Sequence, residues 1–131
     1  MFRLFQLDIP REEFNAVNRL GWTEAMSQFP RIEAHMALST GGSDAYVTEY
    51  DQYFKHVADI DVNDPEKAFL VHNNPHGRTD FDWLVVRYGP QHSMSVGDIL
   101  VGEYGEVLMV DNSGFTQLMS SHLGADVVEA A

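Results

Sequence analysis

The stretch YFKHVADIDVNDPEKAFLVHNN, residues 53–74, constrains the fold of this chain more than any other part of the sequence. Apolar and polar side chains alternate over residues 54–62, which is the period of a half-buried β-strand. Directly afterwards, Asp64 suits the N-cap of a helix, Pro65 its first turn, and Glu66 its positive end. The sequence therefore predicts a strand that runs through a capped turn into a helix, and a proline after the asparagine pair ends that helix.

The alternation also predicts which side chains are buried. On the strand, the residues expected on the inner side are Phe54, His56, Ala58, Ile60 and Val62. On the helix, they are Ala68, Phe69 and Val71. We expect one core between sheet and helix, and its expected members are Phe54, Ile60, Phe69, Ile99 and Val110. At its position, His56 is typical of a neutral histidine with one backbone partner rather than of a catalytic base.

The N-terminal segment predicts a strand followed by three short helices. Residues 4–9 open on aromatic side chains and alternate loosely, as a strand does. The first helix begins at Pro10, carries an apolar stripe on one side and is stopped by a glycine. Thr23 is the expected cap of a second helix that buries Trp22, and residues 31–39 form a third.

The C-terminal half of the chain predicts a hairpin. Residues 98–102 and 106–111 are two apolar runs joined by a Tyr-Gly turn, which is typical of paired antiparallel strands. Upstream, residues 76–91 are mostly polar and hold one short apolar island. We expect this island to anchor Trp83 in the core.

These elements sum to one α+β domain, with a small, mainly antiparallel sheet and helices packed on one face. A length of 131 residues suits a single domain. We expect a helical N-terminal part over about residues 1–50, a strand–helix–hairpin core over about 53–119, and a tail at 120–131.

The charge of the chain is unusual, because 20 acidic side chains against eight Lys and Arg give a formal net charge of −12. Phosphate backbones repel such a protein, so direct binding of nucleic acid is not expected. The acid excess serves either solubility or the binding of a basic partner protein. The chain has no cysteine, which excludes disulfides and thiol catalysis and fits a reducing compartment. Because it shows neither a signal-like N-terminus nor a long apolar run, we expect a soluble, cytoplasmic protein that does not bind membranes.

The histidines and acids do not form a recognisable metal or catalytic motif. His72 and His76 have the spacing that places two ligands on one helix face, but the proline between them ends the helix. Asp80, Asp82 and His92 would complete a site only if the fold brought them there. The sequence has no nucleophile elbow, glycine-rich phosphate loop or calcium loop. We therefore expect no metal and no cofactor, and an enzyme is not the preferred hypothesis.

The stretch HSMSVGDIL, residues 92–100, has an architectural and a functional interpretation. In the first, Gly97 adopts a backbone conformation that a side chain would strain, and Asp98 accepts hydrogen bonds from nearby backbone N–H groups. In the second, a ligand or partner binds in a groove at this corner. Its candidate binding residues are His92, Ser93, Ser95 and Asp98, with Trp83 and Arg87 beside them. The spacing favours the architectural interpretation.

Residues 53–115 resemble the YodL-like domains of small bacteriophage and conjugative-element proteins. The shared features are an aromatic strand, an acidic cap, an AF…N helix, an S-x-S-V-G-D corner and a closing G-F. The matching positions here are Ala68, Phe69, Asn73, His92, Ser93, Ser95, Val96, Gly97, Asp98, Gly114 and Phe115. The resemblance implies accessory or host-takeover functions and implies no catalytic residue.

Three hypotheses on function remain open. The first is an acidic, non-enzymatic interaction protein of phage or mobile-element type, whose acid excess indicates a basic, nucleic-acid-handling partner and a counter-defence role. The second is a small-ligand-binding module, or a weakly defined enzyme, that uses a groove near His92 and Asp98. The third is an accessory protein of the virion or of its assembly. Binding to a basic protein would weaken steeply with salt, whereas a concave, partly apolar ligand pocket would tolerate salt.

Overall fold

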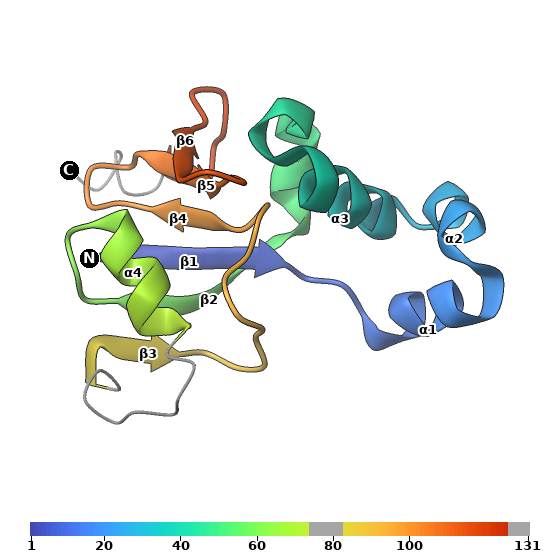
Figure 1. The fold of residues 1–131 in the computed structure, drawn as a ribbon, viewed down its shortest axis with the longest axis horizontal. Helices are drawn as coiled ribbons and strands as arrows, with labels where there is room; N and C mark the ends of the chain where they lie inside the picture. Colours follow the sequence, from blue (N-terminus) through green and yellow to red (C-terminus); the bar gives the residue numbers. More distant parts are fainter. Residues whose placement is uncertain (74–82, 126–131) are drawn as a thin grey trace.

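In the computed structural model, the described residues, 1–73 and 83–125, form one antiparallel sheet flanked by helices. The strands are β1 (Phe2–Leu7), β2 (Phe54–Ile60), β3 (Val85–Arg87), β4 (Ile99–Val101), β5 (Val107–Val110) and β6 (Phe115–Gln117). Their order across the sheet is β3-β2-β1-β4-β5-β6 (Figure 1). The helices are α1 (Arg11–Leu20), α2 (Trp22–Gln28), α3 (Pro30–Gly41) and α4 (Pro65–His72), with 3-10 helices η1 (Gly42–Ala45) and η2 (Thr48–Tyr53). The expected α+β class and antiparallel sheet are confirmed.

The N-terminal strand lies at the centre of the sheet, between β2 and β4 (Figure 1). Leu4 pairs with Ala58 of β2 on one side and with Leu100 of β4 on the other. All three side chains are fully buried. The segment that the sequence grouped with an N-terminal helical part therefore supplies the central strand.

A β-bulge in β2 changes which side chains share a face. The pairing of β1 with β2 shifts between Leu4 and Phe5, which leaves Val57 as an additional residue on β2. As a result, Ala58 belongs to one buried cluster, whereas Phe54 packs against the other. The expected uniform alternation along this strand is wrong, because one inserted residue reverses the faces of everything before it.

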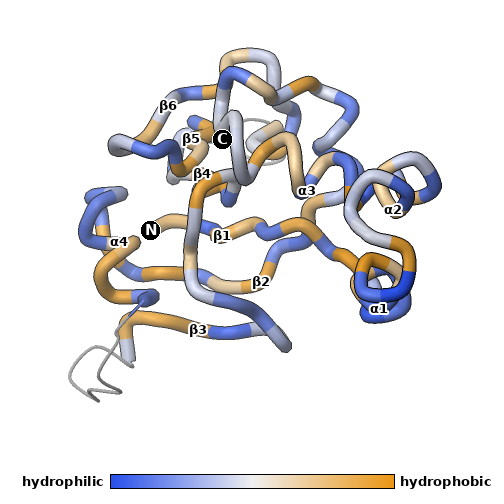
Figure 2. The backbone as a smooth tube through the Cα atoms, turned by 45° about the vertical axis from the view of Figure 1, so that its right-hand side comes forward, coloured by the Kyte–Doolittle hydropathy of each residue, from blue (hydrophilic) through white to orange (hydrophobic). Residues whose placement is uncertain are grey.

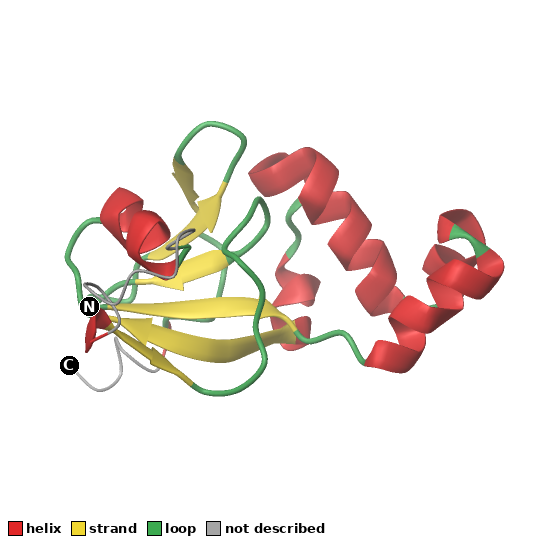
Figure 3. Ribbon diagram, turned by 60° about the horizontal axis from the view of Figure 1, so that its bottom comes forward, coloured by secondary structure: helices red, strands yellow, loops and turns green. Residues whose placement is uncertain are grey.

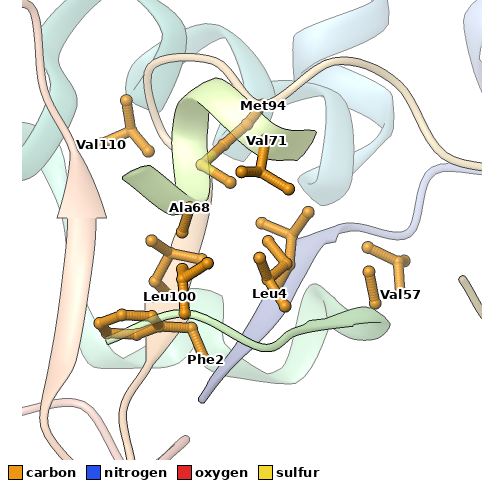
Figure 4. Close-up of a cluster of buried hydrophobic side chains, with 11 residues drawn as sticks. Phe2, Leu4, Val57, Ala68, Val71, Met94, Leu100 and Val110 are labelled. Atoms are coloured by element: carbon orange, nitrogen blue, oxygen red, sulfur yellow. The ribbon is translucent and has the colours of Figure 1, made fainter. Parts of the chain in front are cut away.

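Helix α4 covers the first face of the sheet. Ala68 and Val71 lie on its inner side and pack with Phe2, Leu4 and Leu100 (Figure 4). The same cluster includes Val57, Ala58, Ile60, Val62, Met94 and Val110.

The opposite face is covered by α3 and the 3-10 helices. Leu38 of α3 is buried with Phe5 and Ile99, and Tyr46 and Tyr50 pack against this cluster. Helices therefore lie on both faces of the sheet, rather than on the one face that the sequence predicted. Strand β4 is buried on both sides and is hydrophobic along its whole length, which Figure 2 shows as continuous orange.

The five side chains expected in one core are divided by the sheet. Ile60 and Val110 belong to the cluster under α4, whereas Phe54 and Ile99 belong to the cluster under α3. Phe69 is 36% exposed and belongs to neither buried cluster. The single-core prediction is wrong, because an apolar pattern shows that a side chain is buried without showing on which face.

Helices α1, α2 and α3 follow one another at one end of the sheet (Figure 3). They are held together by a small buried cluster of Val17, Ala25 and Ile32. Helices α1 and α3 lie close to their expected ranges. The expected cap of α2 is wrong, because Thr23 makes no cap hydrogen bond and Trp22 is 42% exposed. No helix in the described part of the chain is long and apolar enough to cross a membrane.

The C-terminal hairpin is confirmed, since β4 and β5 pair directly and β6 adds a further strand. The prediction for Trp83 is wrong, because this side chain is 75% exposed. It lies two residues before the short edge strand β3, whose neighbour in the sheet is β2.

Candidate functional site

A cleft of about 660 Å³ lies at the end of β1, where the chain leaves the sheet for α1. This volume is within the range of small-ligand pockets. The cleft is lined by the ends of β1 and β2, by α1 and α3, and by the connection from β3 to β4. That connection passes the ends of β2 and β1 to reach β4, which brings residues 90–98 against the N-terminal segment (Figure 1).

Asp98 is the most buried charged group of this cleft, with 5% of the residue exposed. Burial raises the pKa of the Asp98 carboxyl to about 7. Its neighbours His92, the Ser95 N–H and the Gln6 amide favour the ionised form and offset part of that rise. Asp98 therefore changes charge close to neutral pH.

The side chain of Gln6 ties the buried carboxyl to the loop. Its Nε2 donates to Asp98 Oδ2 at 3.0 Å and to the His92 carbonyl at 2.9 Å. The Ser95 N–H also donates to Asp98 Oδ2, at 3.0 Å. Because both donors reach Oδ2, the proton of the neutral carboxyl belongs on Oδ1.

His92 has one ring nitrogen engaged and one with a lone pair. Its Nδ1 lies 2.7 Å from the Ser93 carbonyl oxygen, which only accepts hydrogen bonds, so Nδ1 carries the hydrogen in the neutral ring. Nε2 then holds the lone pair. The distance from Nδ1 to Asp98 Oδ2 is 3.9 Å, which is too long for a hydrogen bond. The cleft thus offers an acceptor nitrogen and a titrating carboxyl near each other.

His35 of α3 also lines the cleft. Burial, followed by the nearby His92, lowers the pKa of His35, so its imidazole is neutral at pH about 7. Its ring packs edge-on against Phe14 at 5.6 Å and stacks with Trp22 at 6.1 Å between centroids. These contacts hold a neutral imidazole in the helical wall of the cleft.

The lining of this cleft is less acidic than the chain as a whole, because it holds as many cations as acids. Arg11 and Lys55 are two of the chain's eight Lys and Arg, whereas Asp8 and Asp98 are two of its 20 Asp and Glu. When Asp98 is neutral, the two cations face Asp8 as the one anion of the described lining. The cleft therefore suits a ligand that carries negative charge.

The loop that forms this wall is held at two points. Gly97 has φ +95°, and a Cβ at this position would lie 2.9 Å from the Leu38 Cβ. At the other point, Asn73 Nδ2 donates to the Met94 carbonyl at 2.8 Å, and Asn73 Oδ1 accepts from the Met94 N–H at 2.6 Å. The architectural predictions for Gly97 and Asp98 are confirmed, and the same corner also forms a cleft wall.

The structure brings half of the predicted binding residues to the cleft. Those that line it are His92, Ser95 and Asp98. Ser93 contributes its carbonyl to His92, and its exposed side chain is not part of the lining. Trp83 and Arg87 lie elsewhere, because β3 is the edge strand, two positions from β1. The Arg87 guanidinium instead joins β3 to α4, 2.9 Å from His72 Nε2.

The metal candidates do not converge in the described part of the chain. His76, Asp80 and Asp82 lie outside the described residues. His72 is buried, and its Nδ1 and Nε2 lie 3.0 Å from Asn73 Oδ1 and 2.6 Å from Gln91 Oε1. Within residues 1–73 and 83–125, no group of three or more His, Cys, Asp or Glu side chains could hold a metal ion.

His56 is a half-buried histidine with more partners than expected. Its Nε2 lies 3.1 Å from the Ala58 carbonyl and 2.8 Å from Asp59 Oδ1. The Tyr88 hydroxyl donates to the same carboxylate, and its ring packs edge-on against the imidazole at 5.1 Å. The hydrogen bond that the Tyr88 hydroxyl donates to Asp59 raises the pKa of Tyr88.

Among the cleft residues that sequence reasoning missed are Gln6, Arg11, His35 and Lys55. Gln6 and Asp98 are 92 positions apart, so no local motif joins them. One signal was present, because Gln6 follows Leu4 at the strand period and so occupies an inward position. A buried polar group needs a hydrogen-bond partner, so a glutamine at an inward position of a strand indicates a polar contact in the core.

Comparisons of the chain with family models, curated proteins and solved structures found no match. The resemblance to YodL-like domains therefore stays a hypothesis, and the function is argued from the site.

Proposed function

We propose that this chain is a ligand-binding protein whose cleft at the end of β1 takes a small anionic molecule. One observation carries the proposal: in an acidic chain, a cleft of ligand size, about 660 Å³, is lined by Arg11 and Lys55 and, when Asp98 is neutral, by one anion, Asp8.

The buried carboxyl makes this binding depend on pH. Below pH about 7, Asp98 is protonated and donates a hydrogen bond, as an anion requires. Above it, Asp98 ionises and repels the ligand from within the cleft. The overall charge of −12 acts at longer range, and salt at physiological concentration screens it beyond about 8 Å.

Titration with inorganic phosphate and with citrate, followed by calorimetry, tests the proposal. We expect Lys55→Gln and Arg11→Gln to weaken binding by about three- to tenfold, because each removes one of the two cations. Lys67→Gln is the matched control, since Lys67 is an exposed lysine on α4 that does not line the cleft. Binding by the native protein is expected to weaken from pH about 6 to about 8.

Two results would overturn the proposal. One is the absence of saturable binding of either anion near pH 6. The other is equal weakening by Lys67→Gln, which would show that the general charge of the protein, rather than the cleft, controls binding.

A second candidate function is the binding of a basic macromolecule, favoured by the formal charge of −12. It includes the hypothesis of a phage or mobile-element protein that acts in the cytoplasm of a host cell against a basic, nucleic-acid-handling protein. Such a complex associates through complementary charge, and its affinity falls steeply with salt. Capture from bacterial lysate at low and high salt, with mass spectrometry, tests it. If the captured proteins are not basic, or resist high salt, this candidate fails.

A further inference from the structure

A second hollow, of about 490 Å³, lies between α4 and the turn from β5 to β6. We name it the α4 groove. Its apolar lining includes Phe69, Val96, Val110 and Phe115. Val96 also lines the cleft, so the loop before β4 separates the two hollows.

Phe69 is the partly exposed aromatic side chain that α4 contributes to the groove. It neighbours Ala68, which is fully buried against the sheet, but Phe69 itself is 36% exposed and lines the groove. An aromatic ring with exposed surface at the mouth of an apolar hollow is typical of a binding surface. The same ring is one of the positions shared with the YodL-like pattern.

The charged side chains of the described groove lining are both acidic, Glu66 and Asp111. Asp111 is fixed by Ser43, whose N–H and hydroxyl donate to its two carboxylate oxygens at 2.9 and 2.6 Å. Burial alone would raise the pKa of Asp111, but hydrogen bonds from Ser43 and Thr116 hold it below its usual value. The groove therefore combines an apolar lining with two acidic side chains, and the carboxyl of Asp111 is held in its ionised form.

On the basis of the second candidate function, we propose that the α4 groove binds a segment of a basic partner protein. One large apolar side chain of that segment enters the groove against Phe69 and Phe115. A Lys or Arg on either side of it pairs with Glu66 and Asp111.

A basic partner fits this groove better than a second copy of the chain does. Two copies would each carry a formal charge of −12 and repel one another. They would also bring acid to an edge that is already acidic. A basic segment gains from both the local carboxylates and the overall field.

The peptide acetyl-Lys-Lys-Phe-Lys-Lys-amide is the probe, and backbone amide NMR of nitrogen-labelled protein is the readout. We expect shifts at the groove residues, above all at Phe69, Val96 and Phe115, and smaller ones elsewhere. Two control peptides, with alanine for phenylalanine or glutamate for every lysine, are expected to bind about tenfold more weakly or not at all.

Variants of α4 locate the binding. Phe69→Ser is expected to weaken binding of the probe peptide by about tenfold. Glu66→Gln is expected to weaken it by about two- to fivefold at low salt. Leu70→Ser is the control for Phe69→Ser, because Leu70 is adjacent, 66% exposed and not part of the lining. Glu12→Gln on α1 controls for the loss of one negative charge.

Shifts spread over the acidic surface, unchanged by Phe69→Ser, would overturn the α4 groove as the site. Concentration-dependent self-association that Phe69→Ser abolishes would overturn it in favour of a second copy. Capture from lysate tests the groove assignment separately from the second candidate function, the binding of a basic macromolecule. If Phe69→Ser captures the same basic proteins as the native chain, the groove assignment fails and the second candidate function stands. If neither the variant nor the native chain captures basic proteins, the groove assignment and the second candidate function both fail.

Discussion

At the scale of single residues, Asp98 and Gly97 show how one corner combines structure and chemistry. Asp98 is buried, receives hydrogen bonds from Gln6 and Ser95, and has a pKa raised to about 7 mainly by burial. Gly97 beside it has φ +95° and lies against Leu38. The glycine lets the backbone approach the helix closely, and burial makes the neighbouring carboxyl titrate near neutrality.

Replacing Asp98 by asparagine tests the buried carboxyl through stability. The pKa of Asp98 is about 7 in the folded protein and about 3.9 in an unfolded chain. Between these values the folded state keeps a proton that the unfolded state has lost, so stability falls as pH rises through this window. Asp98→Asn cannot ionise, so it should melt above the native protein at pH about 8 and close to it at pH about 4. Equal pH dependence of both proteins in urea or thermal melts would contradict this.

Two glycine variants separate backbone strain from steric clash. Gly97→Ala is expected to cost about 2–4 kcal/mol, because it combines a positive φ with a Cβ placed 2.9 Å from Leu38. Gly114→Ala has a positive φ but nothing within 4 Å of the added Cβ, so about 1–2 kcal/mol of strain remains. Urea unfolding measures both. Similar losses in the two variants would show that Leu38 moves aside.

At the scale of elements, α4 depends on its ends and on packing. Asp64 Oδ1 accepts from the Glu66 N–H at 3.1 Å, as predicted, and the helix ends at His72. A helix this short is not stable alone in water, so Ala68 and Val71 must hold it against the sheet. Its ends then position Asn73, which anchors the loop that divides the cleft from the groove.

The cap of α4 is tested by Asp64→Ala. We expect a loss of about 0.5–2 kcal/mol in the free energy of unfolding, because the first turn loses an acceptor for one of its N–H groups. Asp64→Ser keeps an acceptor and should recover most of the loss. Asp61→Ala removes the same charge from an exposed position outside the helix and should stay within about 0.5 kcal/mol of the native protein. Equal unfolding midpoints for Asp64→Ala and the native protein would contradict the cap.

At the scale of the whole molecule, the central strand comes from the beginning of the chain. β1 pairs with β2, about 50 positions away, and with β4, about 95 positions away. It therefore joins the strand–helix unit to the C-terminal hairpin. Through Gln6 it also connects the sheet to the loop of the cleft.

This role predicts one cooperative unit that depends on Leu4. Leu4→Ala is expected to cost about 2–5 kcal/mol, because the side chain is fully buried between sheet and helix. Leu70→Ala, on the exposed side of α4, should cost less than about 0.5 kcal/mol. A variant without residues 1–7 that still melts cooperatively would contradict the central role of β1.

The sequence by itself determined the elements whose signals are local. The cap at Asp64, the stop after His72, the helix starting after Pro10 and the hairpin from residue 98 to 111 each depend on side chains within a few positions. So does the turn at Gly97, because positive φ is a property of one residue and its neighbours. Local sterics and local hydrogen bonds act before any tertiary contact exists, so the sequence shows them directly.

Only the tertiary structure decided which face each apolar side chain takes and what the polar residues contact. The bulge at Val57 separated Phe54 from Ile60, and it depends on pairing with β1. The cleft depends on Gln6 meeting Asp98 across 92 positions, and the groove depends on α4 leaving Phe69 outside the core. Such contacts are chosen by the packing of the whole chain, because an apolar or polar side chain can be satisfied by many partners and the sequence pattern records only that it needs one.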